Sequence, residues 1–113
     1  MTKNKLLIVW STSEIEVAEK LVLLYSSVIL ERSYWDEAHL MIWGPSAKVL
    51  AENEKLQKWV GDIQKSGVAT SACVACTDDY GITKKLEAMH IEVTHTGAFL
   101  TQALQSDWKV LTF

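Results

Sequence analysis

Five short apolar runs, separated by longer stretches with helical spacing, constrain the fold of this chain more than any other feature. The runs 5–10 and 38–43 fit strands that are buried in a parallel sheet, and the other three also fit strands. Strands that alternate with helices favour a mostly parallel sheet with helices on both faces. We therefore predict a three-layer α/β/α fold of flavodoxin-like architecture, with the strand order left open. The five predicted strands cover 5–10, 38–43, 68–74, 91–95 and 108–113.

The segments between the predicted strands carry ordinary helix signals. Ser13 and Glu16 have the spacing of a capping box at the start of the first helix. We expect the second helical region to break near Asn53 and the third to be interrupted at Gly81. The predicted helices cover 13–31, 46–66, 78–89 and 97–105. In the first of them the face expected to be buried consists of Ala18, Leu21, Val22, Tyr25, Val28 and Ile29.

Length and charge exclude several classes of protein. The 113 residues suffice for a single domain, 1–113, and the net charge is −3. Scattered basic residues argue against nucleic-acid binding. The apolar stretch LVLLYSSVIL is well short of the roughly 18 residues needed to span a bilayer. No membrane association and no targeting segment are predicted, so we expect a cytoplasmic protein whose cysteines stay reduced.

Candidate site residues lie where the predicted strands end, because ligands of open parallel sheets bind beyond the carboxyl ends of the strands. The candidates for catalysis are the two cysteines, Cys73 and Cys76. Large aromatic residues at strand ends are more often core or interface residues than pocket walls, and a histidine there is more often a plain loop residue. The candidate pocket residues are Trp10, Ser11, Trp43, Gly44 and His95.

The C-x2-C pair allows several chemistries. With His90 and His95 it matches the spacing of a zinc finger, but a predicted strand separates the two histidines, so no metal or other cofactor is predicted. A thioredoxin-like site would follow the first strand of a βαβ unit, whereas this pair follows the third. A nucleophilic thiol that takes and passes sulfane sulfur is the third possibility. The alternative without chemistry is that one or both cysteines are small residues of the hydrophobic core.

Four segments of the chain resemble the DsrE/DsrF-like sulfur-relay family. They are WGPSAKVLAEN (43–53), GVATSACVACTDDYGI (67–82), LEAMHIEVTHTGAFLTQAL (86–104) and WKVLTF (108–113). The resemblance implies an α/β/α fold, trimers or hexamers, and a persulfide passed between sulfur donor and acceptor proteins. By position Cys73 matches the carrier cysteine of the TusD-like relay proteins, and Cys76 matches a second cysteine of small members. Relay proteins have a basic stretch where this chain has the acidic 77–80.

The sequence is therefore compatible with two functions. The first is a persulfide carrier or thiol-redox protein, resembling a sulfurtransferase, that acts through Cys73 and Cys76. The second is a non-enzymatic module of the same fold that binds a small ligand or partner and has inert cysteines. Whether the protein is an enzyme stays open at this point.

Overall fold

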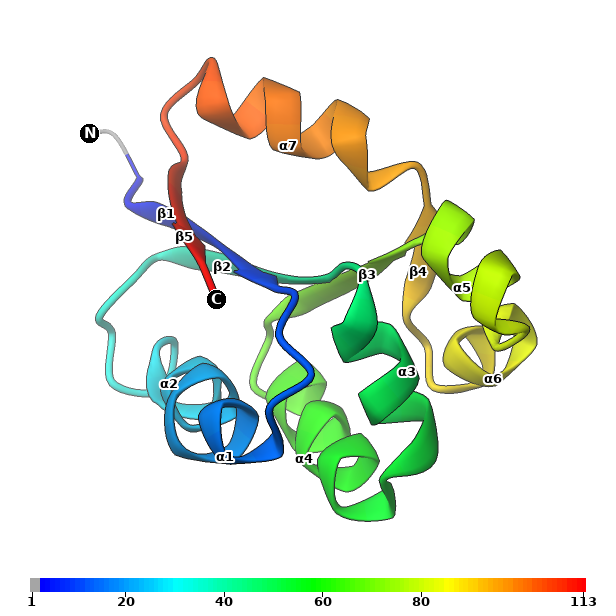
Figure 1. The fold of residues 1–113 in the computed structure, drawn as a ribbon. Coiled ribbons are helices and arrows are strands. Elements are labelled where there is room, and N and C mark those ends of the chain that lie inside the picture. Colours follow the sequence, from blue (N-terminus) through cyan, green and yellow to red (C-terminus); the bar gives the residue numbers. More distant parts are fainter. Residues whose placement is uncertain (1–2) are drawn as a thin grey trace.

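Five parallel strands form one sheet in the order β4-β3-β2-β1-β5 in the computed structural model, which describes residues 3–113 (Figure 1). Strand β1 is central, and it pairs with β2 on one side and β5 on the other. The prediction of five strands in a parallel sheet is confirmed, and each end differs from the predicted one by at most one residue. The strands are β1 Lys5–Trp10, β2 Glu37–Ile42, β3 Ala69–Cys73, β4 Glu92–Thr94 and β5 Lys109–Thr112.

Helices connect every pair of consecutive strands. The two predicted breaks are confirmed: Asn53 separates α3 from α4 and accepts a hydrogen bond from the N–H of Leu56, and Gly81, with φ 71°, ends α5. A stretch of π-helix, η1, lies within the first helical segment. The helices are α1 Ile15–Val17, η1 Ala18–Val22, α2 Leu23–Val28, α3 Pro45–Glu52, α4 Glu54–Lys65, α5 Val74–Tyr80, α6 Thr83–Ala88 and α7 Thr96–Leu104.

The strand order explains why the two faces of the sheet are covered unequally. From β1 the chain moves outward through β2, β3 and β4, and right-handed crossovers place the helices of these three connections on one face. The last connection runs back from β4 to β5, so α7 lies on the opposite face (Figure 1). The larger core therefore joins the sheet to the helices of the first three connections, and a smaller one lies under α7.

The first helical segment differs from the sequence prediction in two ways. The capping box does not form: the helix start at Glu14 has no side-chain cap, and the N–H of Glu14 donates a hydrogen bond to the hydroxyl oxygen of Thr12 at 3.1 Å. Leu21, expected in the core, is 47 % exposed, whereas Leu23 is fully buried. The segment carries apolar residues on both faces, so helical spacing alone could not identify the inner one.

The carboxyl ends of the strands meet at one edge of the sheet, as the prediction required. There the N–H of Trp43 donates to the carbonyl of Trp10 at 3.0 Å, and the hydroxyl of Ser46 donates to the same carbonyl. These bonds hold the start of α3 against the end of β1. Within residues 3–113, no helix is long and apolar enough to cross a membrane.

Candidate functional site

The two cysteines lie at the junction between β3 and α5. Cys73 is the last residue of the strand and the N-cap of the helix, and Cys76 lies in the first turn of that helix. The predicted start of this helix near residue 78 was wrong, since the helix begins at Val74. The acidic Asp78 and Asp79 resembled a first turn but lie one turn further along. Cys73 is 7 % exposed and Cys76 is half-buried, and both thiols are free.

Gly44 connects the cysteine segment to the end of the neighbouring strand. Its backbone N–H donates a hydrogen bond to the sulfur of Cys76 at 3.3 Å. Gly44 has φ 74° and ψ −141°, a conformation that residues with a side chain rarely adopt. Pro45 follows at the first position of α3, where its ring restricts the backbone. The turn that carries the Gly44 N–H donor is therefore held in one conformation.

Cys73 is the more acidic of the two thiols. Burial raises the pKa of Cys73, but hydrogen bonds from the N–H and the thiol of Cys76, the hydroxyl of Thr96 and the N–H of Ala75 outweigh it, and the pKa falls below the ordinary value. These donors stabilise negative charge on the Cys73 sulfur. A thiolate therefore forms first at Cys73.

Cys76 is held in the neutral form by the same arrangement. Burial raises the pKa of Cys76, and so do its hydrogen bond to Cys73 and the negative charges of Cys73 and Asp79. The N–H of Gly44 acts in the other direction without reversing the result. The pair thus ionises in sequence, and the Cys76 thiol acts as a hydrogen-bond donor to the Cys73 thiolate.

Thr96 is a member of the site that sequence reasoning missed. It is the first residue of α7 and is 1 % exposed. Its hydroxyl has no hydrogen-bond partner of standard geometry among residues 3–113, but it lies close enough to the sulfur of Cys73 to lower the pKa of that thiol. The register places Thr94 of β4 directly beside Cys73, which explains why the residue two positions later reaches the site. The sequence signal was its place just after the fourth strand.

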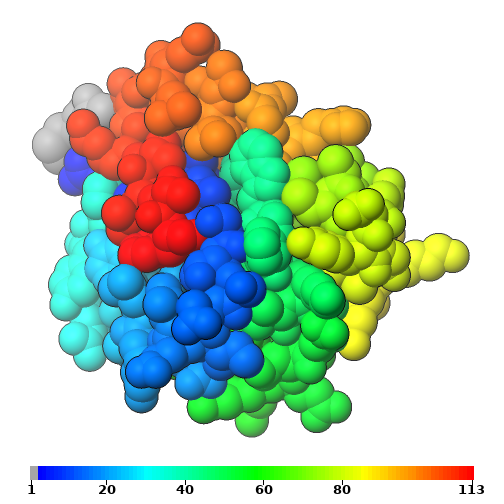
Figure 2. Space-filling view, in the orientation of Figure 1, coloured from blue at the N-terminus to red at the C-terminus, as the bar shows by residue number. Residues whose placement is uncertain are grey.

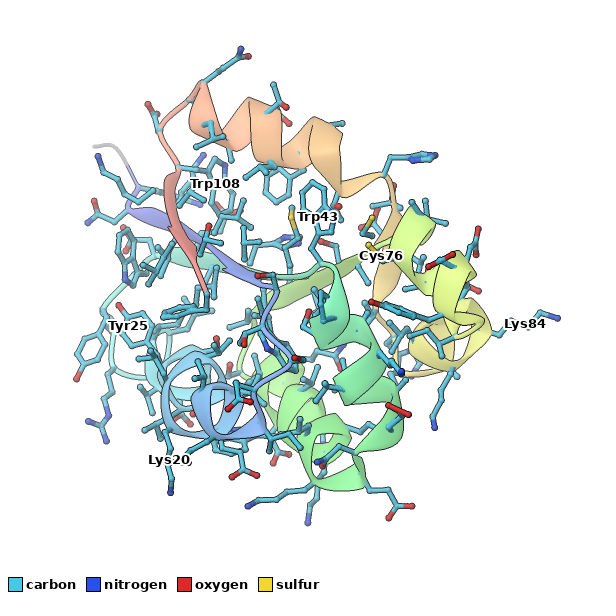
Figure 3. The ribbon with its side chains drawn as sticks, viewed as in Figure 1. Lys20, Tyr25, Trp43, Cys76, Lys84 and Trp108 are labelled. Atoms are coloured by element: carbon cyan, nitrogen blue, oxygen red, sulfur yellow. The ribbon has the colours of Figure 1, made fainter. Side chains whose placement is uncertain are left out.

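Trp43 lies near Cys76, beneath the start of α7 (Figure 3). It is half-buried against the smaller core, and a side-chain carbon added at Gly97 would lie 3.9 Å from its ring. Of the predicted pocket residues, Gly44 places a hydrogen-bond donor against the sulfur of Cys76, and Trp43 precedes it in the chain.

The other three predicted pocket residues take different positions. Trp10 is fully buried in the larger core, and its indole N–H has no hydrogen-bond partner among residues 3–113. The hydroxyl and the N–H of Ser11 both donate to the carbonyl of Phe113 at 2.7 Å, so they fasten the last strand. His95 is the N-cap of α7 and is exposed, and its side chain makes no capping bond.

The zinc-finger spacing does not correspond to a cluster of ligands. His90 follows α6 and His95 precedes α7, so the two histidines lie at opposite ends of β4. In the part of the chain that the structure describes, no group of three or more His, Cys, Asp or Glu side chains is placed to hold a metal. A hollow of about 720 Å³ at the amino ends of β3 and β4 contains neither cysteine.

A polar pair lies on the face of the sheet that α7 covers, between β2 and β3. His39 on β2 and Ser71 on β3 are joined by a hydrogen bond of 2.7 Å between Nε2 and Oγ. The ring of Phe99 contacts His39 edge-on, with the centroids 4.7 Å apart. Burial lowers the pKa of His39 to about 4, so the imidazole is neutral at physiological pH.

The parallel five-stranded sheet with helices on both faces defines an α/β protein of flavodoxin-like architecture, and solved structures share this fold. A structure of BT1422 from Bacteroides thetaiotaomicron, a conserved protein of unknown function, has a TM-score of 0.94 and 25% sequence identity, covering 97% of this chain and 95% of that one. The ychN protein of E. coli has a TM-score of 0.71 at 16% identity, covering 99% and 100%.

The likeness to ychN supports the DsrE-like fold that the sequence resemblance implied. It concerns the fold and does not extend to a sulfur-relay role. No family model and no curated protein matches the chain.

Proposed function

We propose that this protein takes up sulfane sulfur on Cys73 and that Cys76 governs its release. The observation that supports this most directly is the opposite shift of the two thiol pKa values, which makes Cys73 the first of the two thiols to ionise. The thiolate is the nucleophilic form of cysteine, so Cys73 is prepared for attack on a sulfur donor. The family resemblance gave Cys73 the same role by position.

The uptake step is a thiol exchange. The Cys73 thiolate attacks the outer sulfur of a donor persulfide, forms an S–S bond and displaces the donor as a thiolate. Cys73 then carries the persulfide and the donor has lost one sulfur atom. The N–H groups of Ala75 and Cys76 and the hydroxyl of Thr96 stabilise negative charge at this point.

The sulfur can leave Cys73 by one of two routes. An acceptor thiolate can attack the outer sulfur and regenerate the Cys73 thiolate. Alternatively Cys76, once deprotonated, attacks the inner sulfur of Cys73, which closes a disulfide and expels hydrosulfide. The second route consumes the free thiols, and an external dithiol must reduce the disulfide before the next cycle. The raised pKa of Cys76 slows this second route and so protects the persulfide until an acceptor arrives.

Access to the pair favours a protein or small-molecule donor that approaches from the side of Cys76. Cys76 is half-buried whereas Cys73 is 7 % exposed, so the reactive sulfur is shielded from bulk solvent. The exposed Asp78 and Asp79 border the approach on α5. A donor or acceptor with a basic rim around its own sulfur fits this acidic border.

The test is the intact mass of reduced protein after exposure to a persulfide donor. We expect the wild type and Cys76→Ser to gain one sulfur atom and Cys73→Ser to gain none. Cys76→Ser should hold the added sulfur longer, because it cannot close the disulfide. No gain in any of the three, with both thiols shown to be free, would exclude sulfur transfer and favour a binding module with inert cysteines.

A further inference from the structure

A stripe of exposed apolar side chains runs along the first helical segment. It consists of the exposed Val17, Leu21 and Leu24 together with the half-buried Val28, and we call it the outer stripe. Val17, Leu21 and Leu24 are 36%, 47% and 52% exposed. They recur at separations of four and three residues along a segment whose middle, η1, is π-helical, so they follow one side of the segment. Large exposed apolar patches on a small domain mark interaction sites.

Two hollows adjoin the outer stripe and share Leu21 and Lys20. The first, of about 330 Å³, is lined by Glu14, Glu16 and Val17 besides these two. The second, of about 370 Å³, is also lined by Leu24, Tyr25, Val28 and Arg32. Protruding leucines and hollows thus alternate on one surface. Such a surface can fit a copy of itself when the copy is turned so that protrusions meet hollows.

The charges at the two ends of the outer stripe differ in sign. The carboxylates of Glu14 and Glu16 line the hollow at the amino end, whereas Arg32, and not its neighbour Glu31, lines the hollow at the carboxyl end. A parallel pairing of two copies would bring like charges together at both ends. An antiparallel pairing places the acidic end of each copy against the basic end of the other, which is the favourable arrangement.

We propose that the outer stripe is a docking surface for a second copy of this chain, in an antiparallel arrangement about a two-fold axis near Leu21 and Leu24. Both the shape and the charge of the stripe are complementary to the stripe itself, which is the requirement of an isologous contact. The segment lies on the outside of the molecule next to the carboxyl-terminal strand (Figure 2), and Lys20 extends away from the body of the protein (Figure 3). The proposal does not depend on the thiol chemistry.

The experiment is sedimentation velocity across a range of concentrations on the full chain and on Leu21→Glu. We expect an even-numbered assembly for the wild type and a rise of at least about a hundredfold in the dissociation constant for Leu21→Glu, because a carboxylate would be buried among apolar groups. The matched control is Leu104→Glu, at a leucine that is 64% exposed on α7 and outside the stripe. This control should assemble like the wild type.

A charge exchange tests the antiparallel arrangement at exposed positions that do not threaten folding. Arg32→Glu should weaken assembly, and Arg32→Glu combined with Glu16→Lys should restore part of it. A monomeric or odd-numbered wild type, or an unchanged dissociation constant in Leu21→Glu, would overturn the proposal. A double variant that assembles no better than Arg32→Glu alone would overturn the antiparallel geometry.

Discussion

The N–H of Gly44 donates a hydrogen bond to the sulfur of Cys76, and this bond joins the turn after β2 to the first turn of α5. It connects residues that are 32 positions apart in the sequence and lie next to each other at the edge of the sheet. The position of the Cys76 thiol, and through it the hydrogen bond to Cys73, thus depends on a backbone conformation at a different strand end. Substitutions around this bond should change the pKa values of the two thiols and the free energy of unfolding.

Alkylation of the wild-type protein should detect the order of ionisation. We expect Cys73 to be modified with a midpoint at lower pH than Cys76, because hydrogen bonds lower the pKa of Cys73 whereas burial and the charge of Cys73 raise that of Cys76. The measurement is the rate of reaction with iodoacetamide as a function of pH, read separately for the peptides containing each cysteine. Shielding of Cys73 lowers its absolute rate but leaves its midpoint unchanged. Midpoints in the reverse order would contradict the assignment of roles.

Thr96→Val should separate reactivity from stability. Loss of the hydroxyl should raise the pKa of Cys73 and move its alkylation midpoint to higher pH, since one group that stabilises the thiolate is gone. The hydroxyl is buried and has no hydrogen-bond partner of standard geometry among residues 3–113, so its removal should change the free energy of unfolding by less than about 1 kcal/mol. Urea denaturation and the alkylation profile measure the two quantities. Thr96→Ser, which keeps the hydroxyl, should retain the wild-type midpoint.

Gly44→Ala should destabilise the protein by about 1–3 kcal/mol, because alanine at φ 74° and ψ −141° is strained. No atom lies within 4 Å of the added carbon, so strain and not a collision causes the loss. The matched control is Gly61→Ala on α4, where the space is also open and the backbone is helical. This control should stabilise the protein by about 0.5–1 kcal/mol. Equal effects of the two changes in urea denaturation would disprove the explanation.

Acid should destabilise the fold through His39. Its pKa is about 4 in the folded protein and 6.5 in the unfolded chain, so the unfolded chain binds the proton more readily. The stabilising contribution is complete above pH 6.5 and is lost as the pH falls toward 4, with a total of about 3 kcal/mol. Unfolding free energies measured between pH 7 and 4 should fall less steeply for His39→Gln. His90→Gln, at an exposed position, should keep the wild-type slope.

The sequence by itself determined the elements and the end of the sheet where the site lies. Short apolar runs identified all five strands, and Asn53 and Gly81 marked the breaks between helices because their side chain or backbone conformation caps a helix. The carboxyl end of the third strand placed Cys73 and Cys76 among the candidates. These are local properties, which neighbouring residues in the chain specify.

Only the tertiary structure decided how distant segments meet. The strand order β4-β3-β2-β1-β5 brought Gly44 and Thr96 to the cysteines and set Trp10 and Ser11 apart from them. It also decided which face of the first helical segment is buried, so that Leu21 lies outside although its spacing fits the inner face. The periodicity of apolar residues in the sequence shows on which side of its own helix each residue lies. What that side packs against depends on the other elements, and the difference in acidity between the two thiols depends on groups that only the fold places around them.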